Sequence, residues 1–214
     1  MYRRPVFYKY MKQEYVDAFL QEGLLRIGTL YEYRDIEKHG QHIGDDQEGL
    51  KFIEHDYGKV DWRGPHDVPE ELKDTLTMEP GGQIDIRFVS RNTVGSPDYY
   101  LFCVAWEFSA TVMREFGYDS CVRIDNPACF LHEINGVMWD QHAAKALFWR
   151  WCEYTLRKES HDNQTDIPPA IVKSPQFAHQ KEVRAIWEPS EKEIRPLLVT
   201  CMPARQYCSR MQLH

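Results

Sequence analysis

The chain has 214 residues, 43% of them hydrophobic and 13% aromatic, and its formal net charge is −7. This length supplies one sizeable core and favours a single domain over residues 1–214. No apolar run is long enough to cross a membrane and no signal peptide is recognisable, so we expect a cytoplasmic protein without a membrane segment. The negative charge disfavours non-specific adhesion to nucleic acid or anionic lipid.

The first 49 residues predict a strand, a helix, an extended segment and a loop. The strand is expected at residues 6–10. The helix, at residues 12–22, carries its apolar side chains on one face and ends at Gly23. Residues 24–33 look extended. The segment 35–49 is polar and glycine-containing without periodicity, which predicts a loop.

The rest of the chain predicts strands and helices without a regular β-α-β repeat. Strands are expected at residues 83–92, 99–108, 120–125, 147–156, 183–187 and 197–202. Helices are expected after Asp67, from Ser109 to a stop at Gly117, and from Asn126-Pro127 to about Gly136. A helix is the competing interpretation of residues 147–156, and residues 160–174 read as a polar connection. This mixture is typical of an α+β fold.

The six cysteines are spread irregularly and form no C-x-x-C pair. Structural zinc sites use close ligand pairs, so we expect reduced, buried thiols and no cysteine-based metal site. No G-x-S-x-G, Walker or G-x-G-x-x-G motif occurs either. These absences argue against several common classes of enzyme.

The acidic loop has the composition of a metal site but not its spacing. Its candidate ligands are His39, His42, Asp45, Asp46 and Glu48. The two histidines lack the helical i, i+4 spacing, and the acids do not match a calcium loop. We therefore expect a solvated loop without metal, with Asp46 or Glu48 turned toward a cleft. A metal-dependent nuclease built on these five residues is the alternative.

Gln180-x-Glu182 comes directly before an apolar strand, Val183–Trp187. A carboxylate at this point faces a sheet edge, where clefts form. Glycosyl transfer from NAD breaks a C–N bond through a cation-like sugar, which a carboxylate beside the ribose stabilises. The competing interpretation is a surface ion pair between Glu182 and Arg184, and composition alone favours it.

Aromatic and cationic residues alternate near the N-terminus. Tyr8 is suited to stack on nicotinamide or adenine, while Lys9 or Arg26 meets a pyrophosphate. The alternative is that these aromatic side chains pack into the core of a strand pair. The aromatic residues in question are Phe7, Tyr10, Tyr31 and Tyr33.

Two resemblances arise at these residues. The order Tyr8-Lys9-Tyr10, Asp45-to-Gly49, Phe102-Cys103 and Glu182-Val183-Arg184 resembles a large bacterial family of unknown function. Tyr8, the helix ending in Gly23-Leu24-Leu25, and Gln180-Lys181-Glu182 are similar to ADP-ribosyltransferase-like toxins, some of which modify nucleic acids. In those enzymes the first strand usually carries a His or Arg. Here Tyr8 or Arg26 would have to make that contact with the nicotinamide ribose.

The second resemblance implies an ADP-ribosyltransferase-like α+β fold, a single domain with a split, twisted sheet flanked by helices. It implies an NAD-dependent ADP-ribosyltransferase, a bacterial toxin or phage-defence effector that modifies nucleic acid or protein. Glu182 would be catalytic, and NAD would be a substrate. Contacts to NAD are expected from Tyr8, Lys9, Arg26, Thr29, Tyr31 and Tyr33. Contacts to the acceptor are expected from Arg34, Asp46, Glu48 and Gln180.

The expected partners are a macromolecular acceptor, RNA or DNA among the candidates, and an antitoxin protein. No metal and no membrane are expected. The alternative function is a non-enzymatic module that binds a nucleotide or a protein partner in an aromatic cleft.

Overall fold

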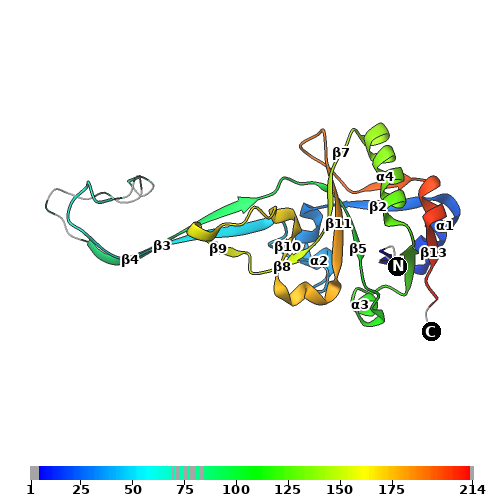
Figure 1. The fold of residues 1–214 in the computed structure, drawn as a ribbon, viewed down its shortest axis with the longest axis horizontal. Helices are drawn as coiled ribbons and strands as arrows, with labels where there is room; N and C mark the ends of the chain where they lie inside the picture. The colour runs from blue at the N-terminus through cyan, green and yellow to red at the C-terminus, as the bar shows by residue number, and fades with distance from the viewer. Residues whose placement is uncertain are drawn as a thin grey trace. The chain divides into compact units, whose positions relative to one another are not determined.

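The computed structural model describes residues 5–68, 70, 73, 74, 77, 81 and 84–212 (Figure 1). Its contacts divide the chain into two compact units. Unit 1 comprises Met1–Leu50, Gly95–Arg157 and Ile167–His214, and unit 2 comprises Lys51–Val94 and Lys158–Asp166. The single domain that the sequence predicts over residues 1–214 stays a prediction.

The elements confirm the α+β class, with several sheets and few helices. The strands are β1 (Phe7–Met11), β2 (Leu24–Thr29), β3 (Leu50–Trp62), β4 (Ile84–Gly95), β5 (Tyr100–Ala105), β6 (Ser120–Ile124), β7 (Lys145–Trp151), β8 (Glu153–Tyr154), β9 (Lys158–Ser160), β10 (Val172–Lys173), β11 (Glu182–Glu188), β12 (Leu197–Thr200) and β13 (Cys208–Arg210). The helices are α1 (Gln13–Glu22), α2 (Ile36–His39), α3 (Ala110–Glu115) and α4 (Pro127–His142). The 3₁₀ helices are Tyr31–Arg34, His161–Asn163, Pro169–Ile171, Pro175–Gln180 and Pro203–Tyr207.

Strand β5 lies at the centre of the eight-stranded sheet of unit 1. Its neighbour β11 pairs with it along its whole length, from Glu182 opposite Ala105 to Trp187 opposite Tyr100. On the other edge, β2 pairs with the first two residues of β5 and β1 pairs only with Ala105. The residues between them, 102–104, therefore have no strand partner on that edge. This gap in the sheet positions the site described below.

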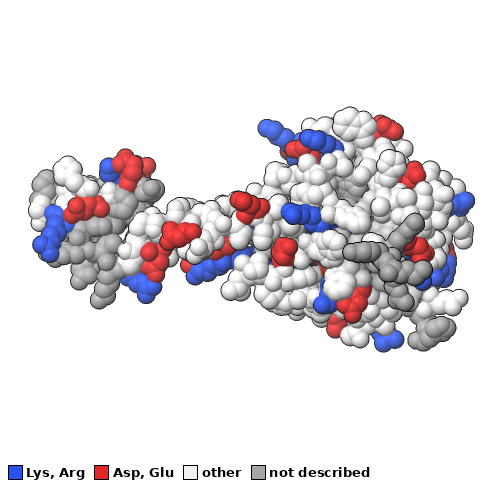
Figure 2. Space-filling model, viewed as in Figure 1, with Lys and Arg blue, Asp and Glu red and all other residues white. Residues whose placement is uncertain are grey.

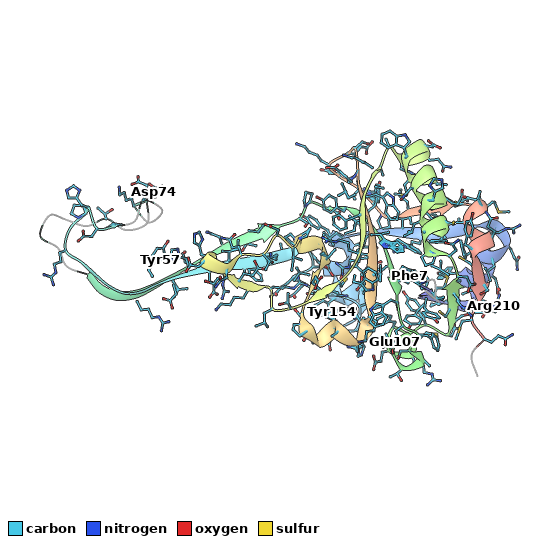
Figure 3. All side chains as sticks on the ribbon, viewed as in Figure 1. Phe7, Tyr57, Asp74, Glu107, Tyr154 and Arg210 are labelled. Carbon is cyan, nitrogen blue, oxygen red and sulfur yellow. The ribbon has the colours of Figure 1, made fainter. Side chains whose placement is uncertain are left out.

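Helices α1 and α4 belong to the main core of unit 1. Val16 and Phe19 are the buried residues of α1, and Gly23 ends that helix as predicted, with φ of +70°. A Cβ at Gly23 would lie 2.7 Å from the backbone of Cys201, so the close approach requires glycine. Figure 3 shows Phe7 within the same packed interior.

Helix α4 begins at Pro127 as predicted but continues to His142, beyond the expected end near Gly136. The prediction of the end was wrong because Met138 extends the buried face of the helix past that glycine. In α3 the Ser109 side chain accepts a hydrogen bond from the Val112 N–H, which confirms the predicted cap. Residues 145–151 form strand β7 rather than a helix, because they pair with β11.

Two N-terminal predictions were wrong in detail. Residues 31–34 form a 3₁₀ helix rather than an extended segment. The Asp98 and Thr29 side chains accept hydrogen bonds from the N–H groups of residues 31 and 32, which turns the chain there. The expected loop at 35–49 contains α2, whose N–H at Lys38 donates to the Asp35 side chain at 2.9 Å.

Unit 2 contains a three-stranded sheet in the order β4-β3-β9. The long strand β3 was not predicted, because residues 56–82 contain several glycines and prolines and a short helix signal. Gly58 adopts a φ of +69°, and its N–H donates to the Asp56 side chain at 2.9 Å, so the strand continues through it. Residue 83 of the expected strand and residues 69 and 71 of the expected helix after Asp67 lie outside the described residues.

All six cysteines are free thiols, three of them buried. No helix in the described part of the chain is both long and apolar enough to cross a membrane. On the face of unit 1 that Figure 2 shows, the described basic and acidic side chains are interspersed over a largely uncharged surface.

Candidate functional site

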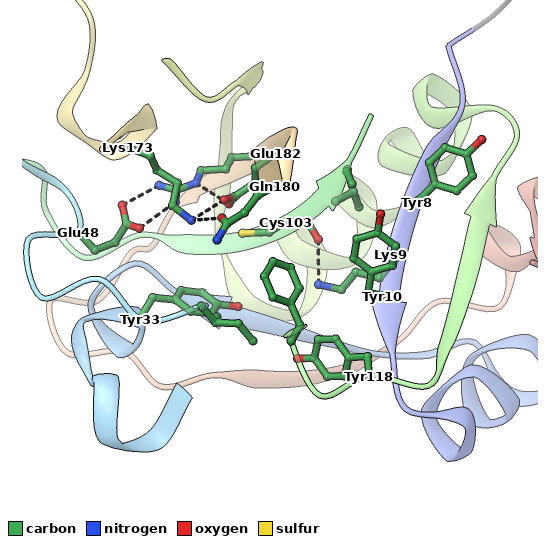
Figure 4. Close-up of a pocket in the computed structure, with 15 residues that line it drawn as sticks. Tyr8, Lys9, Tyr10, Tyr33, Glu48, Cys103, Tyr118, Lys173, Gln180 and Glu182 are labelled. Carbon is green, nitrogen blue, oxygen red and sulfur yellow. Dashed lines mark hydrogen bonds and ion pairs between the residues drawn. The ribbon is translucent and has the colours of Figure 1, made fainter. Parts of the chain in front are cut away.

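A pocket lies in unit 1 at the gap beside β5 (Figure 4). Its free volume is about 80 Å³, enough for several water molecules or one small planar group. Its aromatic lining residues are Tyr8, Tyr10, Tyr33, Phe116 and Tyr118. Its polar and charged lining residues are Lys9, Glu48, Cys103, Lys173, Gln180, Glu182 and Arg184. The pocket thus has one aromatic part and one ionic part.

The ionic part is a chain of four buried charges. Residues 182 and 184 are two positions apart in β11, so both side chains lie on one face of the sheet. The Arg184 Nε donates to Glu182 Oε1 at 2.7 Å, and its two terminal nitrogens donate to the two oxygens of Glu48 at 2.8 Å each. Lys173 Nζ donates to Glu182 Oε2 at 2.8 Å. All four residues are at most 7% exposed.

These contacts keep the four groups ionised. Burial alone would raise the pKa of Glu182, but the Arg184 guanidinium and the Lys173 ammonium outweigh burial and hold that pKa well below its ordinary value. Burial likewise opposes ionisation of Glu48, and Arg184 again keeps its pKa low. Two carboxylates and two cations leave the cluster with no net charge.

The loop that carries Glu48 is held in place by buried contacts. Arg157 contacts the Asp45 carboxylate at 2.5 Å and the Leu50 carbonyl at 3.0 Å. Gly49 then turns the chain with φ of +73°. The expectation of a solvated loop was therefore wrong for Asp45 and Glu48, which are 6% and 0% exposed. Both carboxylates can be buried because each forms an ion pair with a buried arginine, Asp45 with Arg157 and Glu48 with Arg184.

Gln180 ties the ionic cluster to the same loop. Its Oε1 accepts from Lys173 Nζ at 2.6 Å, and its Nε2 donates to the His42 carbonyl at 2.7 Å. At the entry to β11, the Glu182 N–H donates to the Tyr154 hydroxyl at 2.7 Å. Tyr154 is labelled in Figure 3. The residues at the start of β11 are thus held by both backbone and side-chain contacts.

Lys9 enters the gap in the sheet from β1. Its Nζ donates to the Cys103 carbonyl at 2.8 Å, which satisfies a backbone acceptor left without a strand partner (Figure 4). Among the described residues, no carboxylate forms an ion pair with Lys9. Burial lowers the pKa of Lys9, and the nearby Cys103 and Glu182 offset this only in part. Burial also raises the pKa of the Cys103 thiol well above its ordinary value.

The lowered pKa predicts that Lys9 reacts with amine reagents at unusually low pH. Below its pKa the lysine is a cation and does not react, so a lower pKa moves the onset of reaction to lower pH. Labelling with acetic anhydride across a pH series, read by peptide mass spectrometry, measures this midpoint. We expect it below the midpoint of the same lysine in the urea-unfolded chain, where 10.5 is the ordinary pKa. Equal midpoints would contradict the placement of Lys9.

Six of the predicted site residues line the pocket together. They are Tyr8, Lys9, Tyr33, Glu48, Gln180 and Glu182. The other five do not line it. They are Arg26, Thr29, Tyr31, Arg34 and Asp46.

Four of the five residues that do not line the pocket make hydrogen bonds elsewhere. Arg26 forms a two-pronged ion pair with Glu32, at 2.9 and 2.6 Å. The Tyr31 hydroxyl donates to the Ser96 carbonyl at 2.8 Å. Arg34 Nε donates to the Glu48 carbonyl at 2.8 Å, so Arg34 supports the loop from outside. The Thr29 side chain accepts from the Glu32 N–H.

Sequence reasoning did not assign Lys173, Cys103 or Arg184 to the site, and considered Arg184 only as a charge partner of Glu182. The i, i+2 spacing of Glu182 and Arg184 was the available signal, because it places both on one face of a strand. Within the described residues no group of three or more His, Cys, Asp or Glu is arranged to hold a metal. Comparison with protein-family models, curated proteins and solved structures gives no match to this chain. The case for a function therefore rests on the pocket.

Proposed function

We propose that the pocket binds the nicotinamide–ribose end of NAD and that the protein transfers ADP-ribose to a macromolecule. The observation that carries this proposal is the Glu182 carboxylate, kept ionised by Arg184 and Lys173 in the wall of a pocket with aromatic sides. A developing positive charge on the ribose is stabilised by such a fixed carboxylate.

The strand pairing supports the same proposal. We predict an ADP-ribosyltransferase-like fold with a split sheet, and the gap opposite residues 102–104 agrees with a split at β5. The free volume of about 80 Å³ admits one small ring but not a whole dinucleotide. The adenosine and the phosphates of NAD would then lie outside the pocket.

Glu182 has capacity for a ribose hydroxyl. A carboxylate offers about four lone-pair sites, and Arg184, Lys173 and the Cys103 thiol use three of them. In the proposed reaction the bond between ribose and nicotinamide breaks, and its electron pair stays with the ring nitrogen. The nicotinamide leaves neutral and the ribose carbon becomes cation-like. An acceptor nucleophile then bonds to that carbon and loses a proton.

A second candidate is non-enzymatic nucleotide binding. The cluster of Glu48, Arg184, Glu182 and Lys173 has no net charge, and a protonated Lys9 adds a positive one. The pocket wall as a whole is therefore not negative, which suits a neutral or anionic ligand such as a base or a phosphate. Under this candidate the aromatic residues stack on a base and no bond is broken.

Incubation of the wild-type protein with NAD labelled in the nicotinamide distinguishes the two candidates. ADP-ribosyl transfer predicts that labelled nicotinamide is released and accumulates with time when a cell lysate supplies acceptors. The binding module predicts that label is retained on the protein as intact NAD. Absence of any released nicotinamide, with binding measured in the same sample, contradicts the proposed function.

A further inference from the structure

Lys9 is a cation of the pocket wall that forms no ion pair with a described carboxylate. Its amine contacts the Cys103 carbonyl at 2.8 Å and lies 4.8 Å from the centre of the Phe102 ring. In Figure 4 the Lys9 side chain reaches from β1 toward Cys103 and the ionic part of the pocket. The other charged residues of the described lining pair with one another, and they are Glu48, Glu182, Lys173 and Arg184. When Lys9 is protonated, the pocket wall therefore carries one unbalanced positive charge.

The nicotinamide ring of NAD also carries a positive charge, which it loses when its bond to the ribose breaks. The free volume of about 80 Å³ admits one small ring, so a bound ring and the Lys9 amine share one pocket. Two like charges so placed repel each other more strongly than in bulk water. As the bond breaks, the positive charge moves from the ring to the ribose. The repulsion by Lys9 is then relieved in the transition state.

We infer that Lys9 is a second catalytic residue, whose ammonium repels the charged nicotinamide ring and so promotes its departure as a neutral molecule. This inference rests on the proposed function. The electron pair of the broken bond goes to the ring nitrogen, and Lys9 itself neither gives nor takes a proton. With water as acceptor, the water oxygen bonds to the ribose carbon and one proton passes to the solvent. Glu182 stabilises the charge that forms, and Lys9 destabilises the charge that disappears.

The role of Lys9 in the reaction depends on its protonation. Below its pKa the lysine is a cation, and kcat and KM are both high. Above its pKa it is neutral, and both values fall. Charged groups that act on Lys9 from other elements are Arg26, Glu32 and Glu182. The thiols and phenols around it are Cys103, Cys121, Tyr8, Tyr10, Tyr33 and Tyr118. Comparison with Lys9→Met assigns the pH effect to Lys9 rather than to one of these groups.

Nicotinamide release with water as acceptor, measured below the labelling midpoint of Lys9, tests the inference. We expect Lys9→Met to lower kcat and KM about tenfold each and to leave kcat/KM nearly unchanged. In the wild type both values should fall toward those of the variant as the pH rises through that midpoint. The control Lys145→Met removes an exposed lysine of β7 outside the pocket lining, and we expect it to change neither value. A raised KM with an unchanged kcat in Lys9→Met overturns the inference, because it shows that Lys9 attracts NAD.

A binding experiment on the wild type needs no variant, which matters because Lys9→Met leaves the Cys103 carbonyl without its donor. The ring of 1-methylnicotinamide is positively charged and that of nicotinamide is neutral. We expect calorimetric titrations to show their ratio of Kd values shifting about tenfold toward the charged ring as the pH rises through the labelling midpoint.

The two proposals fail separately. An unchanged ratio of Kd values overturns the role of Lys9, while nicotinamide release from NAD by the same protein leaves the proposed function standing. If the wild type releases no nicotinamide under any condition, the proposed function fails and the inference falls with it.

Discussion

Replacing Arg184 with methionine is expected to lower the free energy of unfolding by about 3–5 kcal/mol. The guanidinium contacts both oxygens of Glu48, one oxygen of Glu182 and the Ala170 carbonyl. Methionine fills part of the space but donates no hydrogen bond. It leaves the Glu48 carboxylate buried without a cation, and proteins as a class have only about 5–15 kcal/mol of stability to lose.

Urea unfolding followed by tryptophan fluorescence measures this loss. The matched control is Arg123→Met, because Arg123 also pairs with a carboxylate, Asp125 at 2.9 Å, but both side chains are more than 40% exposed. We expect the control to lose less than about 1 kcal/mol. Equal losses in the two variants would contradict the buried cluster. If Arg184→Met does not fold, adding Glu48→Gln is expected to recover folding in part, since it removes the unpaired charge.

Replacing Glu182 with glutamine is expected to slow nicotinamide release from NAD by about 10²–10³-fold. The proposed function makes this carboxylate the group that stabilises the charge on the ribose, and an uncharged amide of the same size cannot do so. The KM for NAD is expected to change little, because the aromatic walls and Lys9 remain. Initial rates over a range of NAD concentrations separate kcat from KM.

The same substitution also removes a buried carboxylate from its ion pairs, so its control must do the same elsewhere. Glu32→Gln matches it in the burial of the carboxylate, although its partners Arg26 and Lys38 are 44% and 53% exposed. The Glu32 side chain is 7% exposed and contacts two cations, Arg26 and Lys38, whereas the Glu182 side chain is 9% exposed and contacts Lys173 and Arg184. Glu32 does not line the pocket. We expect Glu32→Gln to keep its rate, and a rate loss equal to that of Glu182→Gln would reduce the role of Glu182 to a structural one.

The local elements of unit 1 were predictable because their signals lie within a few residues. Gly23 ends α1 and Ser109 caps α3 through contacts with their own helices. The alternation that places Glu182 and Arg184 on one face is equally local. The segment after β2 was mispredicted because side chains of Thr29 and Asp98 turn it, and Asp98 is far away in sequence. That turn separates Tyr33, in the pocket, from Tyr31, which bonds to Ser96.

The pocket itself was not predictable in detail because it depends on long-range pairing. The gap in the sheet arises because β1 and β2 pair with different ends of β5, and no pattern in a single strand encodes such a choice of partners. Lys173 in the short strand β10 and Glu48 in a turn carry no sequence signature for their meeting at Arg184 and Glu182. The polar composition of residues 35–49 predicted a solvated loop. Two of its carboxylates, Asp45 and Glu48, are instead buried in ion pairs with Arg157 and Arg184, which are distant in sequence.

The most direct test of the proposed role of Glu182 is to measure NAD binding and nicotinamide release on the wild type and Glu182→Gln at equal folded concentration. The account predicts that both proteins bind NAD and that the wild type releases nicotinamide at least 100-fold faster. Nicotinamide release that is equally fast in both proteins, or a wild type that neither binds nor cleaves NAD, would contradict it.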